Sequence, residues 1–197
     1  MKTIIFLIVL FLYSAFYAQT VVQFNQSKSK VDQKLMLTLG TWSLANTAVG
    51  IYGWSKTEDE SKYFHQMNVM WSGVNLALAI PGYFKARKAS TKYKDFAQLY
   101  FAQTKTEKIF LFNTALDVAY ITSGFLFKAH ANNSTQNFNR FQGFGNSLIL
   151  QGSFLFLFDL TALLIHSSRR TKSLDPVLER VKLNFTGSQL GFSYQFY

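Results

Sequence analysis

A chain of 197 residues with 49% hydrophobic and only 15% charged side chains has the size of one domain and is too apolar for a disordered protein. The absence of cysteine excludes disulfide frameworks, thiolate nucleophiles and thiolate metal sites. The net charge of +10 does not indicate nucleic-acid binding, because the basic residues lie in connectors between apolar stretches and no recognition motif is present.

The N-terminus has the three-part layout of a secretory signal peptide. Lys2 gives a positive start, residues 4–13 are almost entirely apolar, and small residues follow as far as Ala18. We therefore expect a signal peptide at 1–18, followed by a polar N-terminal tail at 19–34. Because Phe16 is bulky for its position before the cleavage site, an uncleaved anchor is the alternative.

Four long, nearly uncharged stretches follow, at 35–55, 63–84, 109–127 and 141–166. Each is close to the ~20 residues that a helix needs to cross a bilayer. The alternative is a soluble four-helix bundle, but its helices need polar faces, and the run Phe154–Phe158 leaves little room for one. Residues 35–166 are therefore predicted to form a transmembrane domain. Small residues at helix-contact spacing, as in Gly73/Ala77, support a packed bundle.

The connectors divide sharply by charge. Fifteen Lys and Arg residues lie within 19–34, within 85–108 or after 166, and four lie in the connectors on the other side. The positive-inside rule places the basic side in the cytoplasm, whereas a cleaved signal peptide places it outside. An uncleaved first helix and residence in an outer membrane each remove the conflict, so the orientation is left open.

Two connecting segments have patterns of their own. Within 85–108, apolar residues from Tyr93 to Tyr100 recur at helical spacing, which predicts an amphipathic helix on a membrane surface or a helix-linking turn over the bundle end. Residues 167–197 form a basic tail in which apolar residues alternate with polar ones on both sides of a Thr-Gly-Ser turn. This period of two predicts a β-hairpin.

The candidate site consists of amide and carboxyl groups near the middle of the stretches. These residues are Asn46, Asn75, Asn113, Asp117, Gln151 and Asp159. An ionised Asp at the bilayer centre costs about 2.5–3.5 kcal/mol, and no Lys or Arg lies within the stretches to pair with it. Two interpretations follow: polar contacts that fix which helix packs on which, or a binding site for a proton or ligand.

No nucleophile, phosphate-binding loop or protease motif appears, so no catalytic residue is predicted. His65 and His130 are expected at one membrane face near Glu58 and Glu60, which gives a weak metal hypothesis. Histidines scattered at the ends of spans are usually interfacial residues. We therefore predict no metal and no cofactor.

Three stretches carry a resemblance to a known family. They are Met67-Asn68 with Trp71 and Asn75, Phe112-Asn113 with Asp117 and Tyr120, and Phe141 to Asp159 with Gln151-Gly152. The chain resembles an uncharacterised family of short Bacteroidota cell-envelope proteins with four predicted transmembrane helices, and the Tyr-Ala-Gln that ends the signal is similar to exported proteins of that phylum. The resemblance implies an envelope location and no established activity.

Taken together, these features predict an all-α membrane fold: a four-helix transmembrane bundle with an amphipathic connecting helix and a short C-terminal β-hairpin. The expected location is a cell-envelope membrane, with the inner membrane favoured. The expected role is a non-enzymatic structural or partner-binding subunit, and the expected partners are the lipid bilayer and a second copy or another envelope protein. The alternative is a small proton-linked carrier or ligand-binding membrane module.

Overall fold

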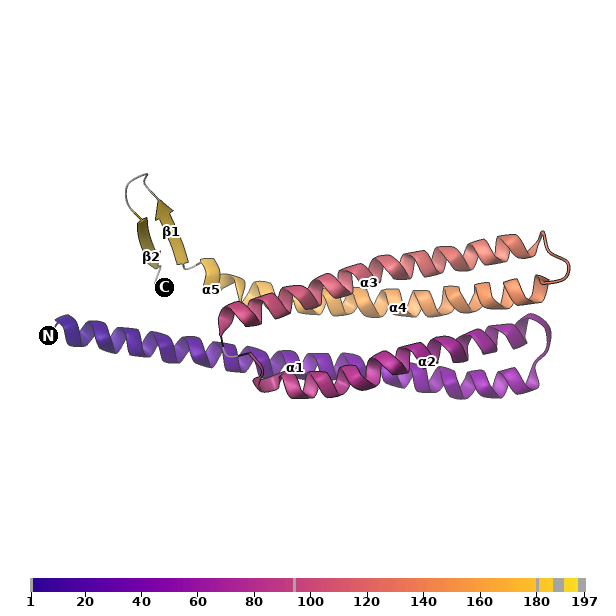
Figure 1. Cartoon of the computed structure of the whole chain (residues 1–197), viewed down its shortest axis with the longest axis horizontal. Coiled ribbons are helices and arrows are strands. Elements are labelled where there is room, and N and C mark those ends of the chain that lie inside the picture. The colour runs from indigo at the N-terminus through magenta and orange to yellow at the C-terminus, as the bar shows by residue number, and fades with distance from the viewer. Residues whose placement is uncertain (1, 94, 180, 186–189, 195–197) are drawn as a thin grey trace.

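Four long helices make up most of the computed structural model, which describes residues 2–93, 95–179, 181–185 and 190–194 (Figure 1). They are α1 (Lys2–Lys56), α2 (Asp59–Lys88), α3 (Phe96–Ala131) and α4 (Phe138–Ser173). A 3₁₀ turn, η1 (Ala89–Thr91), follows α2, and a short helix, α5 (Asp175–Glu179), follows α4. The prediction that four long helices form the body of the protein is confirmed.

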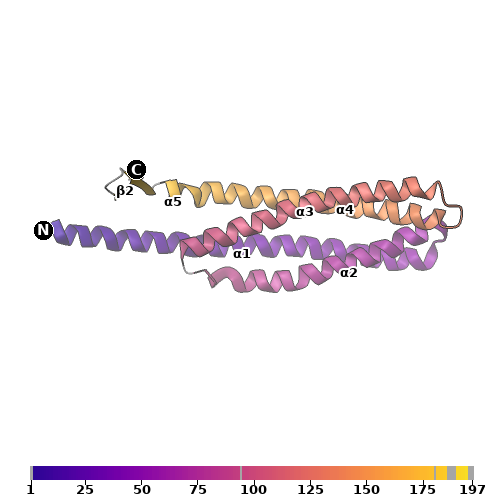
Figure 2. The same cartoon turned by 45° about the horizontal axis from the view of Figure 1, so that its top comes forward.

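The four helices are arranged as two antiparallel hairpins. Helices α1 and α2 pack along one another, and so do α3 and α4 (Figure 2). The two hairpins meet mainly along α2 and α4. In the described chain, no Cα atom of α2 lies within 8 Å of a Cα atom of α3. The bundle is therefore closed on its α2–α4 side. Between α2 and α3 the backbones stay apart, and the rings of Trp71 and Tyr120 contact each other across the gap with centroids 4.8 Å apart.

Residues 19–34, predicted as a polar tail, are helical and belong to α1. Val21 and Phe24 on this segment are buried in a cluster with Phe96, Leu99 and Leu174. The apolar partners are supplied by other helices, so the local sequence alone did not indicate that this stretch packs. The backbone of residues 2–18 continues the same helix.

The separate connecting helix predicted within 85–108 is wrong. Helix α3 begins after Asp95, whose carboxylate accepts a hydrogen bond from the Gln98 backbone N–H at 2.8 Å, the arrangement of a helix N-cap. Neither Pro nor Gly interrupts residues 96–123, so the helix continues without a break into the predicted span. Phe96 and Leu99 are buried inside the bundle. Their burial favours the alternative in which this segment covers the end of the bundle.

Two short strands follow the helices. Strands β1 (Val181–Phe185) and β2 (Leu190–Tyr194) pair antiparallel, with Val181 opposite Tyr194 and Phe185 opposite Leu190. They occupy the two alternating stretches from which the sequence predicts a hairpin. The predicted Thr-Gly-Ser turn lies outside the described residues.

Along the middle of the bundle, polar side chains are buried beside an apolar core that includes Leu39, Phe110 and Leu155, and large apolar side chains lie on the surface. Ser43, Ser72 and Ser147 are completely buried. By contrast, Leu78 is 61% exposed and Leu157 is 64% exposed. This distribution is the reverse of the one that water imposes on a soluble bundle.

Among the described residues, two helices are long and apolar enough to cross a membrane by length and composition. These are Phe96–Ala131 and Phe138–Leu178, with mean hydropathies of 1.4 and 2.0. Neither α2 nor residues 21–56 of α1 meet the same test, because Ser, Thr, Asn and Gly residues within them lower the mean hydropathy. Two of the four predicted spans are therefore supported by this criterion.

Candidate functional site

The predicted polar residues separate into two groups. Asn46 and Gln151 belong to the first group, which we call the closed cluster and which also contains Trp42, Asn68 and Ser147. The amide nitrogen of Gln151 donates to the carbonyl oxygens of Asn68 at 2.8 Å and Asn46 at 3.2 Å, and its oxygen accepts from the Trp42 indole at 3.0 Å. The Ser147 hydroxyl also donates to Asn68, at 2.8 Å. The closed cluster therefore joins α1, α2 and α4 through a Gln151 amide whose two N–H donors and oxygen are all hydrogen-bonded.

The second group lines a groove between α2 and α3. Asn75 comes from α2, Asn113 and Asp117 from α3, and Asp159 from α4, which forms the back of the groove. The cavity measures about 540 Å³, a size typical of small-molecule sites. We call this cavity the acidic groove. It contains four of the six residues predicted from the sequence, and Asn46 and Gln151 lie outside it.

The two aspartates in the acidic groove contact each other. Asp117 and Asp159 share a hydrogen bond between their carboxyl groups, and Asn113 also hydrogen-bonds to Asp159. A hydrogen bond between two carboxyl groups requires a proton on one of them, so the pair carries at most one negative charge. The absence of a Lys or Arg partner within the stretches is consistent with this shared proton.

Several polar atoms in the acidic groove are buried without a hydrogen-bond partner. These are the Trp71 indole nitrogen, the Asn75 amide nitrogen and Oδ2 of Asp117. Asn75 and Asp117 are each only 2% exposed. An unpaired buried polar group costs about 1–3 kcal/mol, so the two donors and the acceptor left free in this cavity carry a cost that a hydrogen-bonding partner would remove.

Glycines explain why helix α4 packs closely against α2 and α3. A Cβ atom placed on Gly145 of α4 would lie 2.6 Å from the carbonyl oxygen of Gly124 on α3. A Cβ atom on Gly143 would collide with the Glu60 carbonyl oxygen and lie 2.7 Å from the Phe64 amide nitrogen on α2. Such close backbone approach is typical of helix packing in membranes. Helix α4 thus contacts both of its neighbours closely and leaves the opening between α2 and α3.

A separate polar network lies at the basic end of the bundle. The ring of His166 is completely buried, and its Nε2 lies 3.1 Å from Oδ1 of Asp32. Lys28 pairs with the other oxygen of Asp32 at 2.7 Å. The Gln103 amide donates to the His166 carbonyl oxygen at 2.8 Å. These contacts connect α1, α3 and α4.

The network continues through a second ion pair. Arg170 donates from Nε to the carboxylate of Glu107 at 3.0 Å and from a terminal nitrogen to Asp175 at 2.5 Å. Glu107 also accepts from the Gln103 amide at 3.1 Å. The network therefore extends from α1 to α5, and each acidic group in it has a cationic or hydrogen-bonding partner.

These contacts shift the pKa values of the network. Burial by itself raises the pKa of Asp32, but the hydrogen bond from His166 and the charge of Lys28 outweigh burial, so the pKa lies below its ordinary value of 3.8. The hydrogen bonds that Arg170 donates to Glu107 and Asp175 raise its pKa further above the ordinary range. Both residues are therefore charged at neutral pH.

Sequence analysis did not identify this network. Its members form pairs four residues apart, namely Lys28/Asp32, Gln103/Glu107 and His166/Arg170. This spacing places each pair on one helix face. It is the sequence signal that could have identified the network. The weak metal hypothesis at the opposite end finds no support, since the described residues contain no group of three or more His, Asp or Glu side chains close enough to hold a metal ion.

The fold and its interior define a class of protein: a helical bundle of two hairpins that buries polar as well as apolar side chains and has two helices long and apolar enough to cross a membrane. Residues 38–160 match the model of a family of unknown function, DUF6992, and the chain belongs to this family. The matched segment contains the closed cluster and the polar residues of the acidic groove, whereas Asp32, His166 and Arg170 lie outside it. No curated protein and no solved structure matches the chain.

Proposed function

We propose that this protein is an integral membrane protein of the cell envelope whose acidic groove binds a small ligand. The observation that carries this proposal is the set of unpaired polar atoms of Trp71, Asn75 and Asp117 inside one cavity. The ligand replaces the missing hydrogen-bond partners and fills the opening between α2 and α3. We propose a binding role rather than a catalytic one, because the polar groups that the groove offers are amides and carboxyl groups, which bind a ligand by hydrogen bonding.

The distribution of exposed apolar residues supports a membrane location. On all four long helices, the side chains that face outward in the middle of the bundle are large and apolar, for example Leu44, Leu78, Phe112 and Leu157. A continuous exposed surface of this kind is unstable in water and is what a lipid-facing surface requires.

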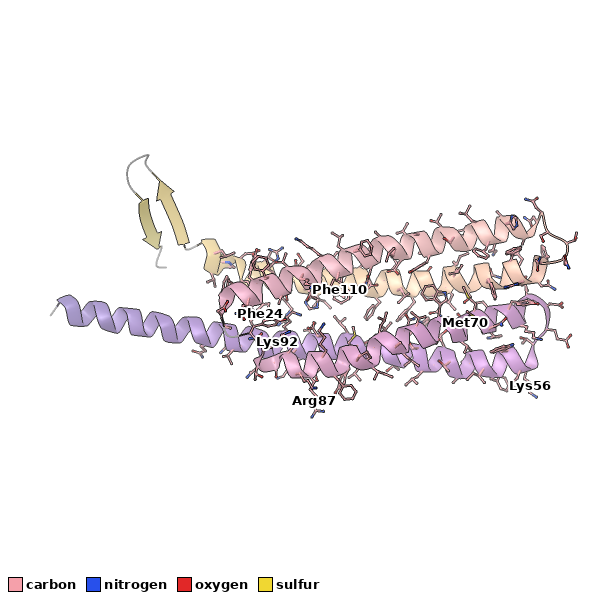
Figure 3. All side chains as sticks on the ribbon, in the orientation of Figure 1. Phe24, Lys56, Met70, Arg87, Lys92 and Phe110 are labelled. Carbon is pink, nitrogen blue, oxygen red and sulfur yellow. The ribbon has the colours of Figure 1, made fainter. Side chains whose placement is uncertain are left out.

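The positions of charged residues support the same location. Each long helix has a basic residue at both ends of a segment that contains no charged residue except Asp117 or Asp159. These pairs are Lys34/Lys56, Lys62/Lys85, Lys108/Lys128 and Arg140/Arg169. At 1.5 Å per residue, the segments span about 30 Å or more, which matches the thickness of a hydrocarbon core. Lys56 and Arg87 accordingly lie toward opposite ends of the bundle (Figure 3).

A purely structural subunit is the alternative role. Such a protein needs polar contacts that hold its helices together, and the closed cluster supplies them. The acidic groove joins α3 to α4 through the hydrogen bonds of Asp159, but Asn75 and Asp117 leave buried hydrogen-bonding atoms unused. The difference between the two groups therefore favours ligand binding.

The membrane location is tested by centrifugation of cell lysates at high speed without detergent, followed by an alkaline carbonate wash. We expect the full-length chain to remain in the pellet after both steps. A chain that stays in the supernatant contradicts the proposal, because the exposed apolar surface would then face water.

The groove is tested with dicyclohexylcarbodiimide, an apolar reagent that reacts with protonated carboxyl groups from the lipid phase. We expect peptide mass spectrometry to find the label on Asp117 or Asp159 in intact membranes, and no label in the D117N/D159N variant. Glu107 is the internal control, because it lies outside the groove and is paired with Arg170. Absence of label on both aspartates contradicts an acidic groove that opens to lipid.

A further inference from the structure

The acidic groove does not end at its polar residues. A second cavity of about 320 Å³ lies next to it toward the basic end of the bundle. Both cavities are lined by Met36, Gly82, Lys85, Ile109 and Phe110. The two therefore form one continuous groove between the hairpins, and its middle is largely apolar. Lys92 and Phe110, both labelled in Figure 3, lie between the two hairpins.

The second cavity is strongly basic. Lys28, Lys85, Lys92 and Lys105 line it, and Asp32 is the one acidic residue among its described lining residues. Asp32 is already paired with Lys28 and contacts His166. Within the part of the chain that the structure describes, Lys85, Lys92 and Lys105 have no carboxylate within 4 Å. This cavity therefore presents three uncompensated ammonium groups.

The two ends of the groove differ in what they can bind. The basic end attracts an anionic head group, as basic pockets between transmembrane helices do. The middle accepts a hydrocarbon chain. The far end offers Asn75 and Asp117, whose free donor and acceptor need a polar group. Ten residues of α2 separate Lys85 from Asn75, which corresponds to about 15 Å along the helix.

We propose that the ligand of the acidic groove is an anionic lipid whose acyl chain carries a hydroxyl group about 15 Å from its charged head. This inference rests on the proposed function, and it adds the chemical class of the ligand. The head group lies among Lys85, Lys92 and Lys105, and the chain enters from the bilayer through the gap between α2 and α3. The chain hydroxyl accepts from the Asn75 amide and donates to Oδ2 of Asp117.

A four-part ligand comparison tests this proposal with the full-length protein in detergent, by native mass spectrometry. The probes are 12-hydroxystearate, stearate, the methyl ester of 12-hydroxystearate, and inorganic phosphate as a competitor. We expect 12-hydroxystearate to bind about five- to tenfold more tightly than stearate or the ester, because each of these lacks one polar contact. Inorganic phosphate should not displace it, because phosphate lacks the chain.

Two double variants assign the contacts. K85Q/K105Q should remove the preference for 12-hydroxystearate over its ester, and D117N/D159N should reduce its preference over stearate. The matched control is K56Q/K62Q, which removes two lysines from the opposite end of the bundle and should leave all the affinities unchanged. Circular dichroism of each variant establishes that the helices are intact.

The outcomes separate this inference from the proposed function. If the ester binds as tightly as the acid, or if K85Q/K105Q changes nothing, the anionic lipid is excluded while a ligand at the aspartates remains. If D117N/D159N has no effect on any probe and the carbodiimide does not label the aspartates, the proposed function fails as well. Equal binding of stearate and 12-hydroxystearate excludes the hydroxyl contact and overturns the inference.

Discussion

The closed cluster and the acidic groove contain the same kinds of side chain, yet they differ in how these are paired. In the closed cluster, the Gln151 amide is satisfied by Trp42, Asn46 and Asn68. In the acidic groove, Asn75 and Asp117 keep buried atoms free. The first site therefore stabilises the bundle, and the second retains unsatisfied hydrogen-bonding capacity that a ligand can use.

The difference follows from which helices approach each other. The closed cluster lies where α1, α2 and α4 surround one point, so amides from three helices meet. The acidic groove lies where α2 and α3 stay apart. Glycines on α4 allow that helix to pack closely against both α2 and α3. Because α4 contacts each of them, α2 and α3 remain apart from each other.

Gly143→Ala tests this geometry and should have the largest effect. The added methyl group collides with backbone atoms of Glu60 and Phe64, which cannot move independently. We expect the free energy of unfolding to fall by about 3 kcal/mol, the upper end for overpacking. The control is Gly73→Ala, where a Cβ atom meets nothing within 4 Å, and the higher helix propensity of Ala should raise stability by about 0.5–1 kcal/mol. Unfolding in mixed micelles with increasing SDS measures both, and equal effects would contradict the packing.

Gln151→Leu tests the closed cluster. The substitution removes three side-chain hydrogen bonds, each of about 0.6 kcal/mol in membrane proteins, and leaves the Trp42 indole without a partner. We expect a loss of about 2 kcal/mol in the same unfolding assay. The matched control is Gln98→Leu at an exposed position of α3, which should change stability by less than about 0.5 kcal/mol. A stable Gln151→Leu variant would show that the cluster does not hold the helices together.

The double substitution D117N/D159N makes the opposite prediction for the acidic groove. The two carboxyl groups have no cationic partner, so neutral amides of the same shape should leave the unfolding free energy unchanged or raise it by up to about 1 kcal/mol. Glu107→Gln is the matched control, because it removes the ion pair with Arg170 and should lower stability by about 1–3 kcal/mol. A D117N/D159N variant as unstable as Gln151→Leu would assign the aspartates a structural role.

The sequence was sufficient to predict the four helices, because basic residues bracket each apolar stretch. It was not sufficient for their ends. Helices α1 and α3 extend beyond the predicted stretches, since Val21 and Phe96 find apolar partners on other helices. The pattern of apolar residues within one helix does not contain that information.

The candidate site was predictable as a set of residues and not as an arrangement. Asn46 and Asn75 have equivalent positions in their stretches, yet Asn46 joins the closed cluster and Asn75 lines the acidic groove. Gly73, predicted to form a helix contact, faces open space, and the close contact involves Gly143 instead. Spacing along a helix identifies a shared face, and only the packing of the hairpins determines what that face meets.

The smallest predicted effect concerns Asp32, which belongs to neither the closed cluster nor the acidic groove and contacts Lys28 and His166 at the basic end of the bundle. Its pKa is lower in the folded protein than its ordinary value of 3.8, so its contribution to stability is present above that value and is lost as the pH falls below it. We expect the unfolding free energy of the native protein to decrease between about pH 5 and about pH 3 more steeply than that of Asp32→Asn. The absolute stability of Asp32→Asn is lower because Lys28 loses its partner, so the slope against pH is the quantity to compare. Parallel slopes would mean that His166 and Lys28 do not stabilise the ionised carboxylate, and the network at the basic end would then contribute packing alone.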